Sequence, residues 1–240
     1  MWRFKLIIGL FLVILPVAQA QVVTRVLTSK KVVALTFDGC ENRHASYLDC
    51  GIIDYLVQNK IPATFFLTGK FAYRNMTDLR KIKNYPFFEF ENHSLNHIQH
   101  MEKLSTYKFY KDIAKNQKMI RWITGKTPKY FRFPGGNYDD NTLKAVESMG
   151  LQVVHWTYAS GDPDKNISSE MLAKEVDSLT TPGDILIFHV NGRGAHTAEA
   201  LPKLVEDLRK QGYTFVTVDQ LMKMEDKTAA ILPKQNAPKN

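Results

Sequence analysis

The chain has 240 residues, 44% of them hydrophobic, and its 32 basic and 24 acidic side chains give a formal net charge of +8 at pH 7. This length suits one α/β barrel domain or two small domains, and the positive charge favours anionic surfaces such as cell-wall polymers. The sequence has no basic stripe with interleaved aromatic residues, which argues against a nucleic-acid-binding protein.

The first 20 residues have the pattern of a secretory signal peptide. Two basic residues precede an apolar run over residues 6–17, and residues 18–20 (Ala-Gln-Ala) form a small-residue cleavage pattern. An uncleaved anchor is the alternative, but the run is too short to span a bilayer comfortably. Cleavage would leave a chain from residue 21 with a net charge of about +6. We expect a secreted or periplasmic protein with no stable membrane insertion after cleavage.

From residue 32 onward, predicted strands alternate with predicted helices. The predicted strands are residues 32–38, 63–67, 87–91, 130–134, 151–158, 184–190 and 213–218. The predicted helices are residues 45–60, 77–83, 106–124, 140–149, 168–179 and 197–211. Because parallel strands need crossover helices, this alternation predicts an α/β fold with a parallel sheet, closed or nearly so. It occupies a single domain over residues 21–226, and residues 227–240 are predicted to form a flexible tail.

The reactive side chains fall at the ends of predicted strands or in the loops just beyond them. This applies to Asp38, His93, Arg132, Asp162 and His189. In a parallel β/α barrel, the carboxyl ends of the strands share one face, where active sites are built. Residues scattered over the sequence are therefore expected to meet at that face.

His93 and His97 are four residues apart, a spacing at which both imidazoles can reach one metal ion. Zinc suits neutral imidazole best, and other divalent transition metals such as cobalt also fit. The alternative is a pair of loop histidines that only form hydrogen bonds. His100 follows three residues later and is expected to be a surface residue.

Two further pairs suggest acid–base chemistry. A carboxylate at the end of a buried strand, as Asp38 is, needs a partner, and Arg132 could hold it ionised and oriented. A purely structural ion pair is the alternative. His189 could act as a general acid, with Asp162 keeping it protonated through the other ring nitrogen. The alternative for His189 is a hydrogen-bonded core histidine.

These residues and their order along the chain resemble the polysaccharide deacetylases, the NodB-homology group of carbohydrate esterase family 4. The similarity extends over about residues 30–222 and rests on five short motifs. They lie at residues 36–38 (Thr-Phe-Asp), 93–97 (His-Ser-Leu-Asn-His), 132–134 (Arg-Phe-Pro), 156–162 and 185–189 (Ile-Leu-Ile-Phe-His).

The resemblance implies a single distorted (β/α) barrel and metal-dependent removal of an acetyl group from an N-acetylated sugar. Asp38 matches the catalytic base, Arg132 the arginine that orients it, and His189 the general acid with Asp162 as its partner. His93 and His97 match the metal ligands. The apolar wall that receives the acetyl methyl group matches Leu186 and Ile187.

The sequence departs from the family pattern at the metal site. The usual first motif has two consecutive aspartates, the second of which binds the metal, but this chain has Gly39 and then Cys40 there. The missing ligand could be replaced by Asp38, Cys40, Glu41, Asp49 or water. A small residue followed by cysteine also occurs in a related subgroup, which favours adaptation over decay.

Two other departures affect the sugar site and the cysteines. Gly135 stands where an aromatic residue is usual, although its backbone N–H could still stabilise an oxyanion, and Pro163 stands where tryptophan is common. Cys40 and Cys50 could form a disulfide in an oxidising compartment, or stay free.

The expected function is therefore removal of acetyl groups from a cell-wall or other N-acetylated polysaccharide, most simply peptidoglycan. Chitin oligosaccharides, other exopolysaccharides and acetylated xylan are alternative substrates. A carbohydrate-binding barrel with weakened catalysis is the alternative from another class of protein, motivated by Gly39. Hydrolysis of a small non-sugar amide is a third possibility.

Overall fold

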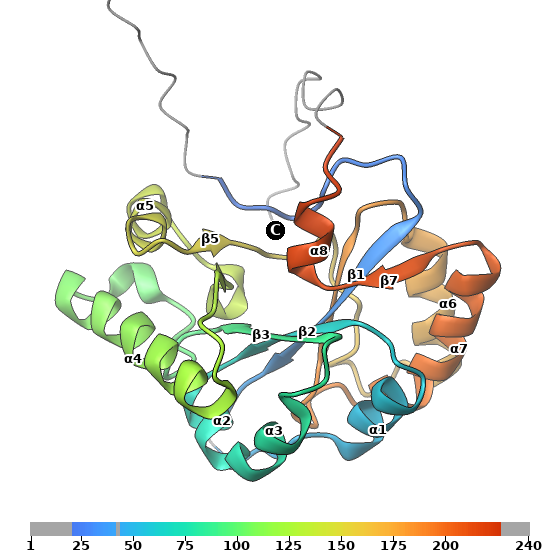
Figure 1. The fold of residues 1–240 in the computed structure, drawn as a ribbon, viewed down its shortest axis with the longest axis horizontal. Helices are drawn as coiled ribbons and strands as arrows, with labels where there is room; N and C mark the ends of the chain where they lie inside the picture. The colour runs from blue at the N-terminus through green and yellow to red at the C-terminus, as the bar shows by residue number, and fades with distance from the viewer. Residues whose placement is uncertain (1–20, 42–43, 227–240) are drawn as a thin grey trace, which may run out of the picture.

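The computed structural model describes residues 21–41 and 44–226 (Figure 1). The predicted signal peptide at residues 1–20 and the predicted tail at residues 227–240 lie outside the described residues. In the described part of the chain, no helix combines the length and the apolar character needed to cross a membrane.

The strands form a seven-stranded sheet in the order β5-β4-β3-β2-β1-β6, with β7 also paired to β1, and all these pairings are parallel. The strands are β1 (Val32–Gly39), β2 (Ala63–Leu67), β3 (Phe88–Asn92), β4 (Tyr130–Phe131), β5 (Gln152–Val153), β6 (Ile185–His189) and β7 (Thr214–Val216). The sheet curves with helices around it, so the predicted distorted (β/α) barrel is confirmed (Figure 1).

Helices surround the curved sheet (Figure 1). They are α1 (Cys50–Gln58), α2 (Gly69–Arg74), α3 (Met76–Ile82), α4 (Thr106–Thr124), α5 (Asp140–Ser148), α6 (Ser169–Leu179), α7 (Thr197–Lys210) and α8 (Val218–Met222). Two of them, α2 and α8, were not predicted. Each is short and is opened by a threonine cap, Thr68 for α2 and Thr217 for α8.

Four predicted boundaries are wrong, and local hydrogen bonds explain two of them. The strand predicted over residues 130–134 ends at Phe131. The helix predicted from residue 45 begins at Cys50, because the Asp49 side chain accepts the backbone N–H of Ile52 at 3.2 Å. The last strand ends at Val216, because Thr217 and Gln220 form the capping box of α8. The strand predicted over residues 151–158 is regular only at Gln152–Val153.

The chain after β5 leaves the ladder with β4 and approaches β6 instead. The backbone N–H of Thr157 donates to the carbonyl of Ile185 at 3.0 Å, and Ala159 forms an isolated bridge with Ile187. This irregular segment lies between the two ends of the sheet. It therefore closes the gap that regular strands leave open.

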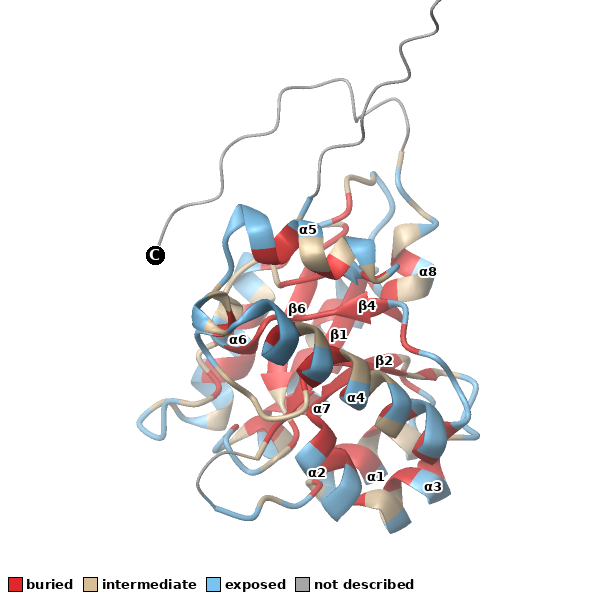
Figure 2. Ribbon diagram, turned by 90° about the vertical axis from the view of Figure 1, so that its left-hand side faces the viewer, coloured by how far each residue is buried: buried red, intermediate tan, exposed pale blue. Residues whose placement is uncertain are grey.

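The strands are buried (Figure 2), and alternation along them separates an outer core from the barrel interior. Leu35 and Phe37 of β1 pack outward in one hydrophobic cluster with residues of the surrounding helices. Ala34 packs inward with an inner cluster near α8, and Thr36 and Asp38 follow it on the same inner face. The inner face changes from apolar to polar toward the carboxyl ends of the strands, where the candidate site lies.

Candidate active site

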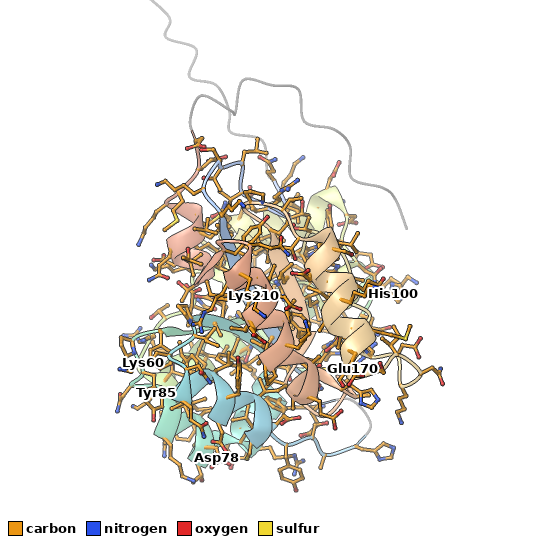
Figure 3. All side chains as sticks on the ribbon, turned by 90° about the vertical axis from the view of Figure 1, so that its right-hand side faces the viewer. Lys60, Asp78, Tyr85, His100, Glu170 and Lys210 are labelled. Carbon is orange, nitrogen blue, oxygen red and sulfur yellow. The ribbon has the colours of Figure 1, made fainter. Side chains whose placement is uncertain are left out.

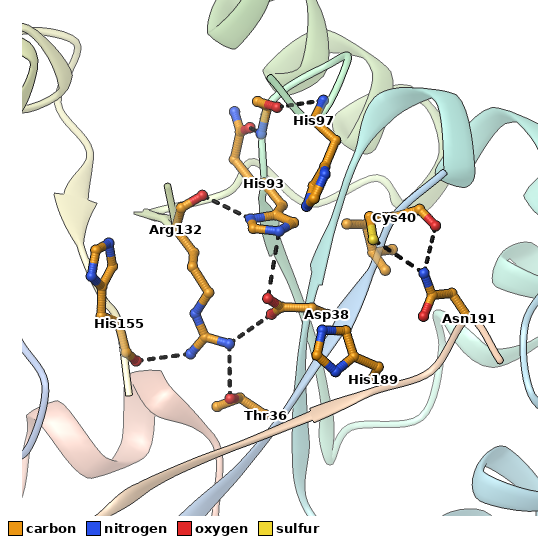
Figure 4. A network of polar contacts seen from close by, with 12 residues as sticks. Thr36, Asp38, Cys40, His93, His97, Arg132, His155, His189 and Asn191 are labelled. Carbon is orange, nitrogen blue, oxygen red and sulfur yellow. Dashed lines mark hydrogen bonds and ion pairs between the residues drawn. The ribbon is translucent and has the colours of Figure 1, made fainter. Parts of the chain in front are cut away.

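Arg132 is the anchor of the polar interior (Figure 4). Its side chain has no exposed surface, and Nη1 donates to Oδ1 of Asp38 at 2.7 Å and to Oγ1 of Thr36 at 3.0 Å. Nη2 donates to the carbonyl of His155 at 2.9 Å, and Nε to that of Val154 at 3.2 Å. The guanidinium is thus held by partners on β1 and on the segment just after β5, which gives it one orientation.

Asp38 is buried but remains ionised in its pair with Arg132. Burial by itself raises the pKa of this carboxyl, but the charge of Arg132 and its hydrogen bond to the carboxylate hold the pKa below the ordinary value. The base predicted from the sequence is therefore ionised and oriented at the carboxyl end of β1.

His93 presents one ring nitrogen to the same carboxylate. Its Nδ1 lies 2.8 Å from the main-chain carbonyl of Arg132, which can only accept, so Nδ1 carries the hydrogen. Burial lowers the pKa of His93, so the ring is neutral and Nε2 has a free lone pair. That Nε2 lies 3.4 Å from Oδ2 of Asp38. Two acceptors therefore face each other with no hydrogen between them.

His97 completes the predicted pair (Figure 4). Its ring centroid lies 5.0 Å from that of His93. Burial, followed by the charge of His93, lowers the pKa of His97 to about 3, so this ring is also neutral. Its buried Nδ1 has no hydrogen-bond partner among the described residues. An orphaned nitrogen beside two facing acceptors is the arrangement expected of a cation site.

The structure narrows the candidates for the third metal ligand. Glu41 forms an ion pair with Arg74, with Nη2 and Oε1 2.9 Å apart, and Asp49 caps α1. The Cys40 thiol faces the Asn191 amide at 3.1 Å, and burial raises its pKa to about 12, which favours the neutral thiol. Each of these three side chains is engaged elsewhere.

Asp38 is the remaining protein candidate. Zinc–ligand bonds of about 2 Å place two donors of one tetrahedral ion about 3.4 Å apart, which matches the Asp38–His93 separation. No group of three or more His, Cys, Asp or Glu side chains arranged to hold an ion occurs in residues 21–41 and 44–226. The two imidazoles and Asp38 Oδ2 beside His93 are donors that fit a divalent metal, although they do not form a preformed three-ligand site.

The loop that carries the two histidines is held by α4. Oδ1 of Asp112 accepts the backbone N–H of Leu95 at 2.7 Å, and Oδ2 accepts the Asn96 side-chain amide at 2.6 Å. His97 and Ser94 both have positive φ, 56° and 68°, and the Ser94 hydroxyl accepts the His97 N–H at 3.0 Å. The left-handed backbone needs such support, because side-chain-bearing residues disfavour it.

A second layer of amides supports the start of this loop. Oδ1 of Asn92 accepts the Ser94 N–H at 2.9 Å and the Asn116 amide at 2.7 Å, and Asn116 also donates to the carbonyl of Leu67. The sequence interpretation missed Asp112 and Asn116. Their signal was available, because they are polar residues four apart on the otherwise apolar face of the predicted helix 106–124.

His189 and Asp162 form the second dyad. Nδ1 of His189 lies 2.9 Å from Oδ1 of Asp162, and the His189 backbone N–H donates to Oδ2 at 2.7 Å. The Thr197 hydroxyl donates to the same Oδ2 at 3.0 Å. A side chain at Gly194 would lie 2.4 Å from that oxygen, so glycine is required there. The carboxylate accepts, so Nδ1 carries the hydrogen and the opposite nitrogen is left for the site.

The two dyads are neighbours across the sheet. Asp38 pairs in register with His189 of β6, so both side chains lie on the same face. Figure 4 shows the His189 ring beside the Asp38 carboxylate, with the His93–His97 pair on the other side of Asp38. The five residues predicted at strand ends and His97 are thus brought to one place.

The predicted substrate-contacting residues are placed differently from one another. Ile187 pairs with Thr36 and shares the inner face, whereas Leu186 packs outward in the core cluster with Leu35 and Phe37. Of the two residues predicted as the acetyl wall, Ile187 is therefore the one on the face of Asp38. Gly135 lies in the turn after β4 with φ 66°, a conformation that favours glycine.

The two cysteines are free in the structure, Cys40 buried and Cys50 exposed. His100 is exposed, as expected, and its Nδ1 contacts Glu102 at 2.9 Å (Figure 3).

A polysaccharide deacetylase family model matches residues 25–154, which include Asp38, both histidines of the pair and Arg132. The chain belongs to the polysaccharide deacetylase family. A peptidoglycan-N-acetylglucosamine deacetylase of Bacillus cereus is 32% identical over 198 residues, which cover 81% of this chain and 90% of that protein. The peptidoglycan-N-acetylmuramic acid deacetylase PdaA of Bacillus subtilis is 30% identical, over 81% of this chain and 73% of that protein.

Solved structures of the deacetylase family have the same fold. The Bc1960 peptidoglycan N-acetylglucosamine deacetylase superposes with a TM-score of 0.76 at 25% identity, over 85% of this chain and 95% of that one. A family 4 pseudoenzyme of Bacillus anthracis has a TM-score of 0.75 at 25% identity, with 86% and 70% covered. An acetyl xylan esterase of Clostridium thermocellum, in complex with a cobalt ion, superposes with a TM-score of 0.70 at 27% identity. The match covers 80% of this chain and 91% of that one.

Position 39, where this deacetylase has glycine, faces away from the site. A Cβ atom at Gly39 would lie 2.7 Å from side-chain atoms of Leu67 and Phe71, in the outer core. An acidic side chain there would have to displace both. Position 39 therefore cannot supply a metal ligand to the inner face. Asp38 is the residue of β1 that brings a carboxylate to that face.

Proposed function

We propose that the chain is an exported, metal-dependent N-deacetylase that removes acetyl groups from the N-acetylated amino sugars of peptidoglycan. The observation that carries the proposal is the pairing of two dyads, Asp38–Arg132 and His189–Asp162, on adjacent strands beside the His93–His97 pair. The peptidoglycan deacetylases among the relatives support the substrate, and the apolar run at residues 6–17 supports export.

The residues divide the proton transfers of amide hydrolysis between them. Asp38 is ionised and takes the proton of the attacking water, while Arg132 holds the carboxylate in place. His189, oriented by Asp162, gives a proton to the departing amine. Zinc or cobalt bound by His93 and His97 would supply Lewis-acid polarisation of the water and of the acetyl carbonyl. The products are acetate and a free amino sugar.

A carbohydrate-binding barrel with weakened catalysis is the second candidate. It is favoured by the lack of a preformed group of three metal-binding side chains in the described residues and by the similarity to a pseudoenzyme. Retention of a buried, oriented acid and base argues against it, because a pure binder has no use for either.

Mass spectrometry of muropeptides from peptidoglycan treated with the purified protein tests the proposal. Loss of acetyl groups from the sugars, dependent on added zinc or cobalt, is the expected result. Binding to peptidoglycan without any loss of acetyl would support the second candidate instead. Acetylated xylan and chitin oligosaccharides, tested in parallel, cover the other substrates.

A further inference from the structure

A groove of about 220 Å³ lies directly beside the loop that carries the two histidines. Leu95, Asn96 and Ile98 of that loop form one wall of the groove, and the other wall comes from α4 and the chain just before it. A ligand in this groove would therefore lie next to the segment that positions His93 and His97. The remaining lining residues are Leu104, Lys108, Lys111, Asp112 and Lys115.

The α4 wall concentrates the positive charge of the protein. Residues 103–121 contain six basic residues and one acidic residue, Asp112, whose side chain is buried and bound to the loop. The whole chain from residue 21 has a net charge of only about +6. The excess of five basic residues makes this segment strongly positive toward an anion.

The groove lysines, like most lysines in the described part of the chain, have no carboxylate partner. Five lysines elsewhere form ion pairs within 4.0 Å, namely Lys81, Lys129, Lys203, Lys210 and Lys223. Among the described residues, Lys108, Lys111 and Lys115 have no carboxylate at that distance, although Lys111 contacts the Tyr107 hydroxyl at 2.9 Å. Like charges three and four residues apart on a helix repel each other. An anion in the groove would relieve that repulsion.

We infer that this groove binds carboxylate groups of the glycan strand, so that the enzyme selects carboxylate-bearing peptidoglycan over neutral chitin. Peptidoglycan carries free carboxylates on its stem peptides, and on the lactyl groups of muramic acids that have no stem peptide, whereas chitin has none. The inference rests on the proposed function, because it places the groove beside the deacetylation site. Continuity with the histidine loop favours a substrate over an unrelated anion, and an anionic lipid surface is the competing ligand.

The test compares a charge-reversed groove with an equal charge reversal elsewhere. The groove variant is Lys108→Glu/Lys115→Glu, and the control is Lys144→Glu/Lys174→Glu, two exposed lysines of α5 and α6. Substrates are peptidoglycan, the same peptidoglycan with carboxylates converted to methylamides, and a neutral N-acetylglucosamine oligosaccharide. Sedimentation with each peptidoglycan measures binding independently of metal content and catalysis.

The groove variant should lose about three- to tenfold in kcat/KM and in binding on native peptidoglycan, chiefly through KM. On the methylamidated polymer and the neutral oligosaccharide, the groove variant should match the wild type. The control variant should match the wild type on all three substrates. Equal losses on charged and neutral substrates, or no loss on native peptidoglycan, would overturn the inference. The inference would also be overturned if the groove variant lost binding to vesicles of anionic lipid but bound peptidoglycan as the wild type does. If the wild type releases no acetate, the proposed function fails, and the sedimentation result still decides the groove.

Discussion

Arg132 and Asp38 are joined by a hydrogen bond of 2.7 Å inside the barrel, and neither side chain is more than 6% exposed. A charge removed from water this completely is stable only while its partner remains. The pair therefore has two roles that can be separated by mutation. It holds the carboxylate ionised at the end of β1, and it keeps the interior electrically balanced.

Replacing the proposed base should abolish most of the activity. We expect Asp38→Asn to reduce acetate release by about 100- to 10 000-fold, because the amide cannot accept the proton of the attacking water. The control is Asp54→Asn, an exposed carboxylate of α1, which should behave as the wild type. Full activity of Asp38→Asn on peptidoglycan would exclude this mechanism.

Removing the arginine should reduce stability as well as activity. Arg132→Met leaves Asp38 without its cationic partner, and we expect the free energy of unfolding to fall by about 3–5 kcal/mol. Arg132→Lys keeps the charge but cannot reach four acceptors, so an intermediate loss is expected. Urea denaturation measures both. Wild-type stability of Arg132→Met would show that the pair is dispensable for folding.

The metal content should depend on Asp38 and not on Cys40. We expect chelation to abolish acetate release, with recovery on adding zinc or cobalt. The metal affinity should fall in Asp38→Asn and His97→Ala but stay unchanged in Cys40→Ser, because the thiol is protonated and faces Asn191. Metal titration followed by elemental analysis gives these affinities. A large loss in Cys40→Ser would instead identify the thiol as the third ligand.

The α4 carboxylate should tune the metal site without touching the metal. Asp112→Ala removes both acceptors of the histidine loop, so we expect a metal affinity about 10- to 100-fold lower. Asp112→Asn keeps one acceptor for the Leu95 N–H and should lose less. If both variants lose stability but bind metal as tightly as the wild type, Asp112 has only a structural role.

His155 should make the protein less stable in acid. Burial, followed by the charge of Arg132, lowers the pKa of His155 to about 3, and its Nε2 has no partner among the described residues. The ring is neutral when folded but takes up a proton on unfolding below its ordinary pKa of 6.5. Its contribution to stability is therefore present above pH 6.5 and is lost as the pH falls toward 3.

The matched variant is His155→Phe, which keeps an aromatic ring beside Phe133, Tyr138 and Trp156. At pH 5, chelator-treated His155→Phe should be about 2 kcal/mol more stable relative to the wild type than it is at pH 7. Urea denaturation across this range measures the difference, with the exposed His100→Gln as control. A parallel pH dependence of the two proteins would show that His155 does not titrate on unfolding.

Much of the fold could be predicted from local pattern. Short apolar runs marked the seven strands, and the helix Thr106–Thr124 was predicted at its observed bounds, with Gly125 at its end in the left-handed conformation. Errors fell where capping decides a boundary, at Asp49 and Thr217. They also fell after β5, where contacts with a distant strand replace a regular ladder.

The sequence by itself determined which side chains reach the site, because strand ends of a parallel barrel converge on one face whatever the details of packing. Asp38, His93, Arg132, Asp162 and His189 could be named on that ground. Only the tertiary structure decided what each of them contacts. Whether Glu41, Asp49 or Cys40 replaces a missing ligand depends on which partner satisfies each group in three dimensions, and those partners are distant in the sequence or formed by local caps.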